Sequence, residues 1–221
     1  HTRYGTVTGV QTCALPIWDK ETPSYRLGLY GCLLGTCGRP QDGKLLRDLV
    51  ENADTRPLTG VDGLLGGYCI LDPGKGPGFV LEVLGNPKND FNYRYAALRT
   101  VRFLLTEIPR IDRQPIYDQL TKSIAVPDSA DLVIDELRKH KVWSALPQVL
   151  AVYGKDEFDL QVVRRAVIRF ALKCPDPKAA AFVADLKKKD PQLIADVEEI
   201  LRFEETQEAE ALSKSAAGPK K

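Results

Sequence analysis

Side chains that commonly perform acid–base or nucleophilic chemistry are sparse in this sequence of 221 residues. Once His1 is set aside, for a reason given below, His140 is the only histidine, so a Ser-His-Asp or Cys-His arrangement could use no other residue. His140 lies in the basic run 138–141 (Arg-Lys-His-Lys), and cations of this kind complement the dipole at a helix end. We therefore expect an exposed helix-end residue rather than a general base, and we exclude metal sites that need two histidines.

The cysteines and paired carboxylates do not form a recognisable site either. Four cysteines remain beyond residue 17, with no C-x-x-C pair, and the Cys32-x4-Cys37 spacing is unlike that of zinc ligands. Cys32, Cys69 and Cys174 lie among apolar residues, which favours buried free thiols over disulfides. The glutamate pairs at 198–199 and 204–205 fit the polar face of a last helix. We expect no catalytic residue, no metal and no cofactor.

The elements that must position any site are helices. Apolar residues recur with helical spacing, as in Ala130, Val133, Ile134 and Leu137, and no segment alternates as a half-buried strand would. Prolines and aspartates mark helix starts, and Pro147 predicts a kink or a late start in its own helix. The fold class is all-α. We predict helices near 24–35, 40–53, 60–71, 77–85, 91–107, 112–124, 128–139, 142–154, 159–173, 177–189 and 191–205.

Three of these helices share a pattern of a large apolar residue, an arginine, any residue and a small residue. The arginines are Arg26, Arg94 and Arg164, which are 68 and 70 residues apart, or about twice the length of one helical hairpin. Ala96 and Ala166 hold the small position, where a short side chain lets a neighbouring helix approach closely. We expect the arginines to bridge neighbouring repeats, and a ligand-binding role is the alternative. Candidate acidic partners in the loops are Asp90, Asp128 and Asp156.

This pattern resembles HEAT repeats, whose second helix carries Val-Arg-x-x-Ala after a turn containing aspartate. Residues 163–166 (Val-Arg-Arg-Ala) match closely, whereas residues 93–96 have Tyr for Val and the first copy has Gly28 for Ala. The chain also resembles bacterial HEAT-repeat proteins of unassigned function. The resemblance implies an armadillo-like α-solenoid of about five to six antiparallel helical hairpins that form a right-handed superhelix. The spacing is shorter than that of most HEAT units and equals that of tetratricopeptide repeats, whose Trp, Leu-Gly and Tyr pattern is not found in register.

Composition narrows the class of partner. There are 31 basic and 30 acidic residues, so net charge gives no reason to expect nucleic acid, and no apolar run approaches the length of a membrane span. The leading hypothesis is a scaffold without catalysis that binds another protein, through aromatic residues such as Trp143, Tyr117 and Tyr153. One alternative is a HEAT-like lyase-type enzyme or chromophore-binding protein. Another is a structural C-terminal segment of a larger multidomain protein.

The first residues resemble something other than a gene product. Met is absent, and residues 7–17 (VTGVQTCALPI) are similar to the translation of a common sequencing adapter. We expect 1–17 to be a non-native segment, 18–205 to be the helical domain, and 206–221 to be a flexible tail. On this interpretation the true N-terminus is missing and a signal peptide could have been lost, so the sequence leaves the compartment open.

Overall fold

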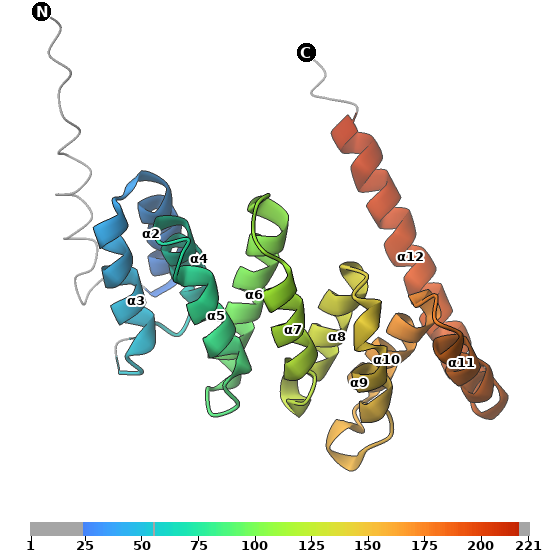
Figure 1. Ribbon diagram of the computed structural model, residues 1–221. Coiled ribbons are helices and arrows are strands. Elements are labelled where there is room, and N and C mark those ends of the chain that lie inside the picture. The colour runs from blue at the N-terminus through green and yellow to red at the C-terminus, as the bar shows by residue number, and fades with distance from the viewer. Residues whose placement is uncertain (1–23, 55, 217–221) are drawn as a thin grey trace, which may run out of the picture. The chain divides into compact units, whose positions relative to one another are not determined.

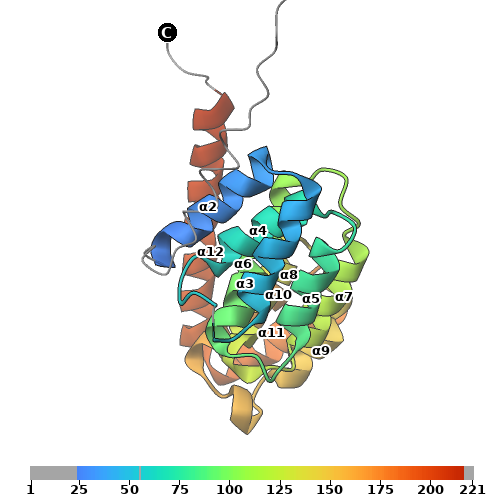
Figure 2. The same cartoon turned by 90° about the vertical axis from the view of Figure 1, so that its left-hand side faces the viewer.

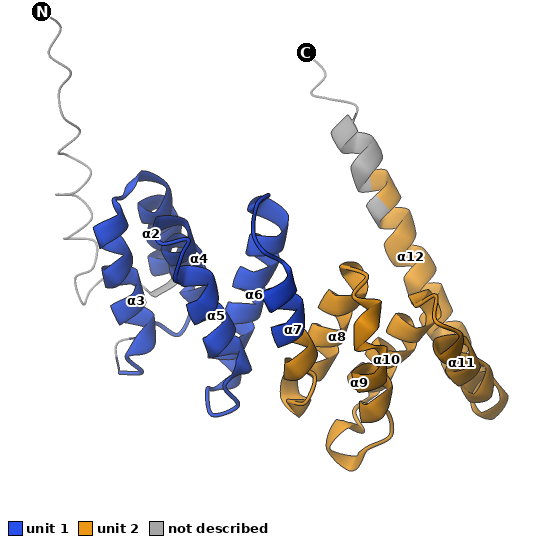
Figure 3. Cartoon of the chain, viewed as in Figure 1, with its two compact units in different colours: residues 1–119 blue, residues 120–221 orange. Residues whose placement is uncertain are grey.

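In the computed structural model, the described residues are 24–54 and 56–216, and this part of the chain contains α-helices and short 3-10 helices but no strand. It divides into two compact units at residues 119 and 120, and the division falls within α7 (Figures 1 and 3). The expected adapter segment 1–17 lies outside the described residues. The helices are α2 (Ser24–Cys37), α3 (Gly43–Glu51), α4 (Val61–Leu71), α5 (Gly76–Gly85), α6 (Phe91–Glu107), α7 (Gln114–Ser123), α8 (Ala130–Lys139), α9 (Leu146–Val152), α10 (Gln161–Lys173), α11 (Pro177–Lys189) and α12 (Pro191–Ala216).

The expected all-α fold is confirmed, and the proline signals act at helix starts. The 3-10 helices Pro40–Asp42, Pro127–Ser129 and Trp143–Ala145 lead directly into α3, α8 and α9. Pro147 lies in the first turn of α9, where its missing N–H removes no helical hydrogen bond. Of the two predicted effects of Pro147, a kink or a late start, the helix shows the late start, because α9 begins at Leu146. Asp190 caps α12, because the backbone N–H of Leu193 donates to its carboxylate at 3.0 Å.

In unit 1, α4 is the central helix and packs against α2, α3, α5 and α6. Leu64 and Leu65 of α4, Val80 of α5 and Val101 of α6 are fully buried between these helices. In the same unit, α2 packs on α4 and α4 on α6, while α3 packs on α4 and α5 on α6 (Figure 2). Unit 1 therefore has a layer of even-numbered helices against which odd-numbered helices pack.

The contact between α2 and α4 depends on glycine. Gly28, Gly31 and Gly35 of α2 have the same spacing as Gly60, Gly63 and Gly67 around α4, which lie 32 residues later in the chain. A Cβ atom built at Gly31 would lie 2.8 Å from the carbonyl oxygen of Gly63 and 2.8 Å from the Cα of Leu64. The two backbones are thus close enough to exclude any side chain at this position.

In unit 2, α10 packs against α8, α9, α11 and α12. The apolar stripe predicted at Ala130, Val133, Ile134 and Leu137 is fully buried. A second core cluster is formed by Ile168 of α10 with Ile194 and Val197 of α12. The same packing of one central helix against sequence neighbours therefore occurs in both units.

Two expectations about local structure are corrected. The last helix was expected to end at 205, but α12 continues to Ala216, because the segment after Glu205 consists largely of Ala, Glu, Gln, Leu and Lys, which favour helix. Cys32 was expected to be buried, but it is exposed, with its thiol 3.8 Å from the carbonyl oxygen of Gly63 beside the contact between α2 and α4, while Cys69 and Cys174 are buried. Among the described helices, none has the length and low charge needed to cross a lipid bilayer.

Candidate functional site

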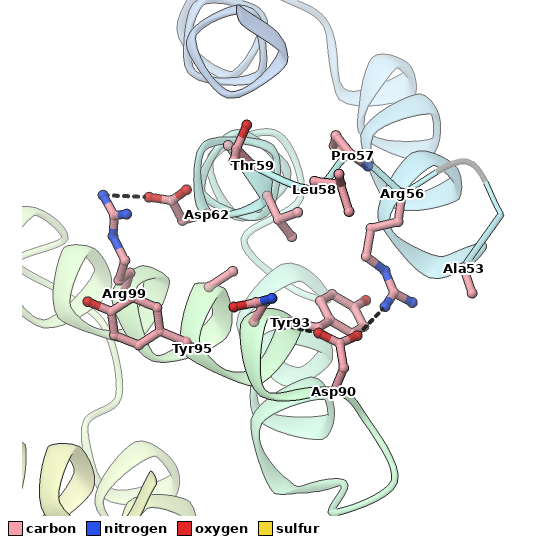
Figure 4. A pocket seen from close by; sticks show the side chains of 14 residues that line it. Ala53, Arg56, Pro57, Leu58, Thr59, Asp62, Asp90, Tyr93, Tyr95 and Arg99 are labelled. Carbon is pink, nitrogen blue, oxygen red and sulfur yellow. Dashed lines mark hydrogen bonds and ion pairs between the residues drawn. The ribbon is translucent and has the colours of Figure 1, made fainter. Parts of the chain in front are cut away.

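A cavity of about 460 Å³ lies in unit 1 between the loop that joins α3 to α4 and the first turns of α6 (Figure 4). The loop contributes Arg56, Pro57 and Leu58, and α6 contributes Tyr95 and Arg99. Its volume is within the range of ordinary ligand sites, and its walls combine apolar, aromatic and charged side chains.

Arg56 is fixed at one end of this cavity. Its Nε donates to the carbonyl of Val50 at 2.7 Å, and its Nη1 lies 3.3 Å from the carboxylate of Asp90. The guanidinium carbon lies 3.5 Å from the centre of the Tyr93 ring, which is a cation–π contact. Asp90 is also the N-cap of α6 and accepts a hydrogen bond from the backbone N–H of Tyr93 at 2.9 Å. The loop is therefore tied to the start of α6 by one arginine.

A second ion pair closes the other end, as Figure 4 shows. The Nη2 of Arg99, on α6, lies 3.0 Å from the carboxylate of Asp62, on α4. Each arginine in the cavity thus has an acidic partner within it, so the cavity presents fixed donors and acceptors without an excess of either charge.

Between the two ion pairs lie groups suited to contact with an apolar side chain. Leu58 lines the cavity and is 89% exposed, so its side chain is open to contact with a ligand. Tyr95 stacks on Phe91 with ring centroids 5.8 Å apart and an interplanar angle of 5°, so its ring is held in place. Burial raises the pKa of Tyr93 to about 12, so its hydroxyl stays protonated at neutral pH. The cavity therefore offers aromatic and apolar surface between two ion pairs.

Unit 2 has a smaller groove of about 340 Å³, where the end of α8 meets α10 and α12. It contains Trp143, whose ring makes an edge-to-face contact with Phe170 at 5.2 Å. Of the three aromatic residues predicted to bind a partner, Trp143 alone lines one of the cavities described here. Tyr153 packs edge-to-face on Phe182 at 5.1 Å, and burial raises its pKa, while Tyr117 lies half-buried on α7.

The residues predicted to join neighbouring repeats lie in both units. Arg94 is 3% exposed within unit 1, Arg26 is exposed on α2, and Arg164 pairs with Asp159 just before its own helix rather than with Asp156. Asp128 and Asp156 lie exposed in 3-10 helices, and Ala96 and Ala166 are buried. Asp90 forms a bridge to a segment far along the chain, and its partner is Arg56.

Sequence reasoning missed Arg56 because the loop at 53–60 carries no periodic pattern. A signal was nevertheless present, since Arg56 precedes Asp90 by 34 residues, the length of one hairpin. The same interval separates Asp135 from Arg169, and the Nη2 of Arg169 lies 2.6 Å from a carboxylate oxygen of Asp135. A similar interval of 35 residues separates Arg169 from Glu204, which also form an ion pair. A search for opposite charges one repeat apart would have found these pairs.

Asp135, Arg138, Arg169 and Glu204 form a closed ring of ion pairs that joins α8, α10 and α12. Burial raises the pKa of Asp135 against the opposing influence of the two arginines. Glu204 was expected on a polar outer face, but it is half-buried in this ring. The ring therefore joins the last helix to α8 and α10 within unit 2.

A third cavity, of about 490 Å³, lies in unit 1 beside Cys69, Leu81 and Ile111, and its walls are mostly apolar. Within the described part of the chain, no three His, Cys, Asp or Glu side chains cluster closely enough to hold a metal ion. No protein-family model, curated protein or solved structure that was compared with the chain matches it.

Proposed function

We propose that this chain is a protein-binding module, built as a right-handed α-solenoid of five to six HEAT-like helical hairpins, and that the unit 1 cavity takes a short segment of the partner. The observation that carries the proposal is the exposed Leu58 facing a site whose other groups, Tyr95 and the paired Arg56 and Arg99, are already held in position. Pre-ordered aromatic and arginine side chains are typical of binding hot spots, because little conformational entropy is lost on binding.

The repeat architecture is supported by intervals within each unit. Gly28 and Gly60 are 32 residues apart and meet backbone to backbone, and Arg56 and Asp90 are 34 residues apart. In unit 2, the ion pair of Arg169 with Glu204 spans 35 residues. Contacts that recur near one hairpin length are expected when each hairpin packs mainly on the next.

The chemistry of the cavity restricts its occupant. Since both arginines are paired within the cavity, a strongly charged segment would have to break an existing ion pair. A segment with an apolar side chain, flanked by groups that form neutral hydrogen bonds, fits the walls better. Its affinity should therefore come from contact with Leu58 and Tyr95 and should depend only weakly on salt.

The test is selection of peptides from a random displayed library with the whole chain as bait, followed by titration of the recovered peptide. Tyr95→Ala and Leu58→Ser should each weaken its binding about tenfold or more. The control is Leu160→Ser in unit 2, an exposed leucine that is 53% accessible and outside the cavity. The proposal fails if no peptide is enriched, or if the control weakens binding as much as the two cavity variants.

A further inference from the structure

The groove beside Trp143 in unit 2 has an excess of cations. It is lined by the charged side chains of Arg138, Lys139, Lys141 and Lys173, and by the carboxylates of Glu204 and Glu205. Both carboxylates are engaged, because Glu204 lies 2.8 Å from Arg138 and Glu205 pairs with Lys173. Lys139 and Lys141 are exposed and form no ion pair with any described residue. The groove therefore offers two ammonium groups to an anionic ligand.

The backbone at Lys141 makes this more than a chance cluster of surface charge. Lys141 has a φ of 57°, and it is the one residue other than glycine with a positive φ in the described part of the chain. Lys141 follows the end of α8. Its backbone N–H donates to the carbonyl oxygen of Arg138 at 3.0 Å, and the backbone N–H of Val142 donates to the carbonyl oxygen of Leu137 at 2.9 Å. This pair of hydrogen bonds defines a Schellman motif, and glycine is the usual residue at the left-handed position.

A lysine at this position carries a conformational cost that glycine would avoid. The motif itself is formed by backbone groups, so the lysine side chain is not needed to end the helix. What the side chain adds is an ammonium group on the rim of the groove, two residues from Trp143. The residue that ends α8 is thus better explained by binding than by folding.

We propose that Lys139, Lys141 and Trp143 form a binding site for an acidic segment of a partner protein, with carboxylates on the lysines and an adjacent apolar side chain on the indole. The inference rests on the proposed function, to which it adds a second site and a chemical class of partner. Charge complementarity selects the occupant, because the cations in the groove outnumber its carboxylates. Unlike binding in the unit 1 cavity, binding of the acidic segment in this groove should weaken strongly as the salt concentration rises.

The experiment follows the indole N–H signal of Trp143 by NMR, assigned with Trp143→Phe, during titration of the whole chain. The probe is a short peptide in which Glu alternates with Leu, and the reference peptide has Gln in place of Glu. The Glu peptide should shift the signal and the Gln peptide should not. The double variant Lys139→Gln, Lys141→Gly should weaken binding about tenfold.

The matched control is Lys187→Gln, Lys188→Gln, which removes the same charge from exposed positions elsewhere in unit 2. It should leave the affinity within about twofold. Equal weakening by both double variants would mean non-specific attraction and would overturn the proposal. So would a shift of the same size from inorganic phosphate alone, which would mean a site for free anions, or from vesicles of anionic lipid, which would mean a membrane contact. Failure here leaves the unit 1 cavity untouched, since its test uses a different peptide and different variants.

Discussion

The close approach of α2 and α4 can be tested with a pair of Gly→Ala substitutions. At Gly31 a Cβ atom would lie 2.8 Å from two backbone atoms of α4, well inside ordinary van der Waals contact. At Gly78, in the first turn of α5, a Cβ atom would meet nothing within 4 Å. Replacing glycine by alanine in a helix stabilises it by about 0.5–1 kcal/mol, and this gain is common to both sites.

The difference between the two variants therefore isolates the cost of forcing the helices apart. Overpacking of this kind costs about 1–3 kcal/mol. The free energy of unfolding of Gly31→Ala should therefore be lower than that of Gly78→Ala by this amount. Urea denaturation followed by circular dichroism measures both variants against the natural chain. If Gly31→Ala is as stable as Gly78→Ala, the two helices do not meet through their backbones and the described packing of unit 1 is wrong.

Further predictions concern packing, titration and the end of α8. Ala96→Leu and Ala166→Leu should each lower the free energy of unfolding by about 1–3 kcal/mol, and a neutral result at both would contradict the repeat register. Tyr93 ionises near its ordinary pKa of 10.0 in the unfolded chain but near 12 in the folded chain, so loss of its proton favours unfolding. The free energy of unfolding should fall as pH rises between these values, and Tyr93→Phe should reduce that fall in an alkaline denaturation series. Burial raises the pKa of Cys69 to about 12, so iodoacetamide should label it only in urea, whereas the exposed Cys32 and Cys37 should react in the native chain. Labelling of Cys69 in the native chain, located by mass spectrometry of peptides, would show that α4 is not packed as described. Lys141→Gly should raise the free energy of unfolding by about 1 kcal/mol, and a loss of stability would mean that the lysine side chain supports the fold.

Local signals in the sequence were sufficient to place the helices. Pro147 and Asp190 act at helix starts through backbone effects that involve only neighbouring residues. The buried stripe that includes Val133 and Leu137 follows from helical periodicity alone. These properties are encoded within one or two turns of chain, which is why single-sequence reasoning recovers them.

The candidate site was harder to predict because its residues come from separate segments. Arg56 lies in an irregular loop, and its importance appears only when Tyr93 and Asp90 are placed beside it. Leu58 carries no sequence signal that separates an exposed leucine from a buried one. Trp143 was predicted from its residue type, but the lysines that share its groove were interpreted only as charges at a helix end.

The exposure of Cys32 and the length of α12 show two further limits. An apolar neighbourhood in the sequence cannot show how much of Cys32 the contact between α2 and α4 covers, because that depends on how the glycines of the two helices meet. Where α12 ends depends on helix propensity summed over several residues. The polar composition after residue 205 was interpreted instead as a tail.

Whether a partner segment binds in the unit 1 cavity can be measured by hydrogen exchange of the whole chain with and without a selected peptide. Exchange should slow at 56–62 and 90–99, the two segments that form the cavity, and should stay nearly unchanged elsewhere in unit 1. Protection confined to other segments, or none at a saturating concentration of peptide, would contradict the assignment of this cavity as the binding site.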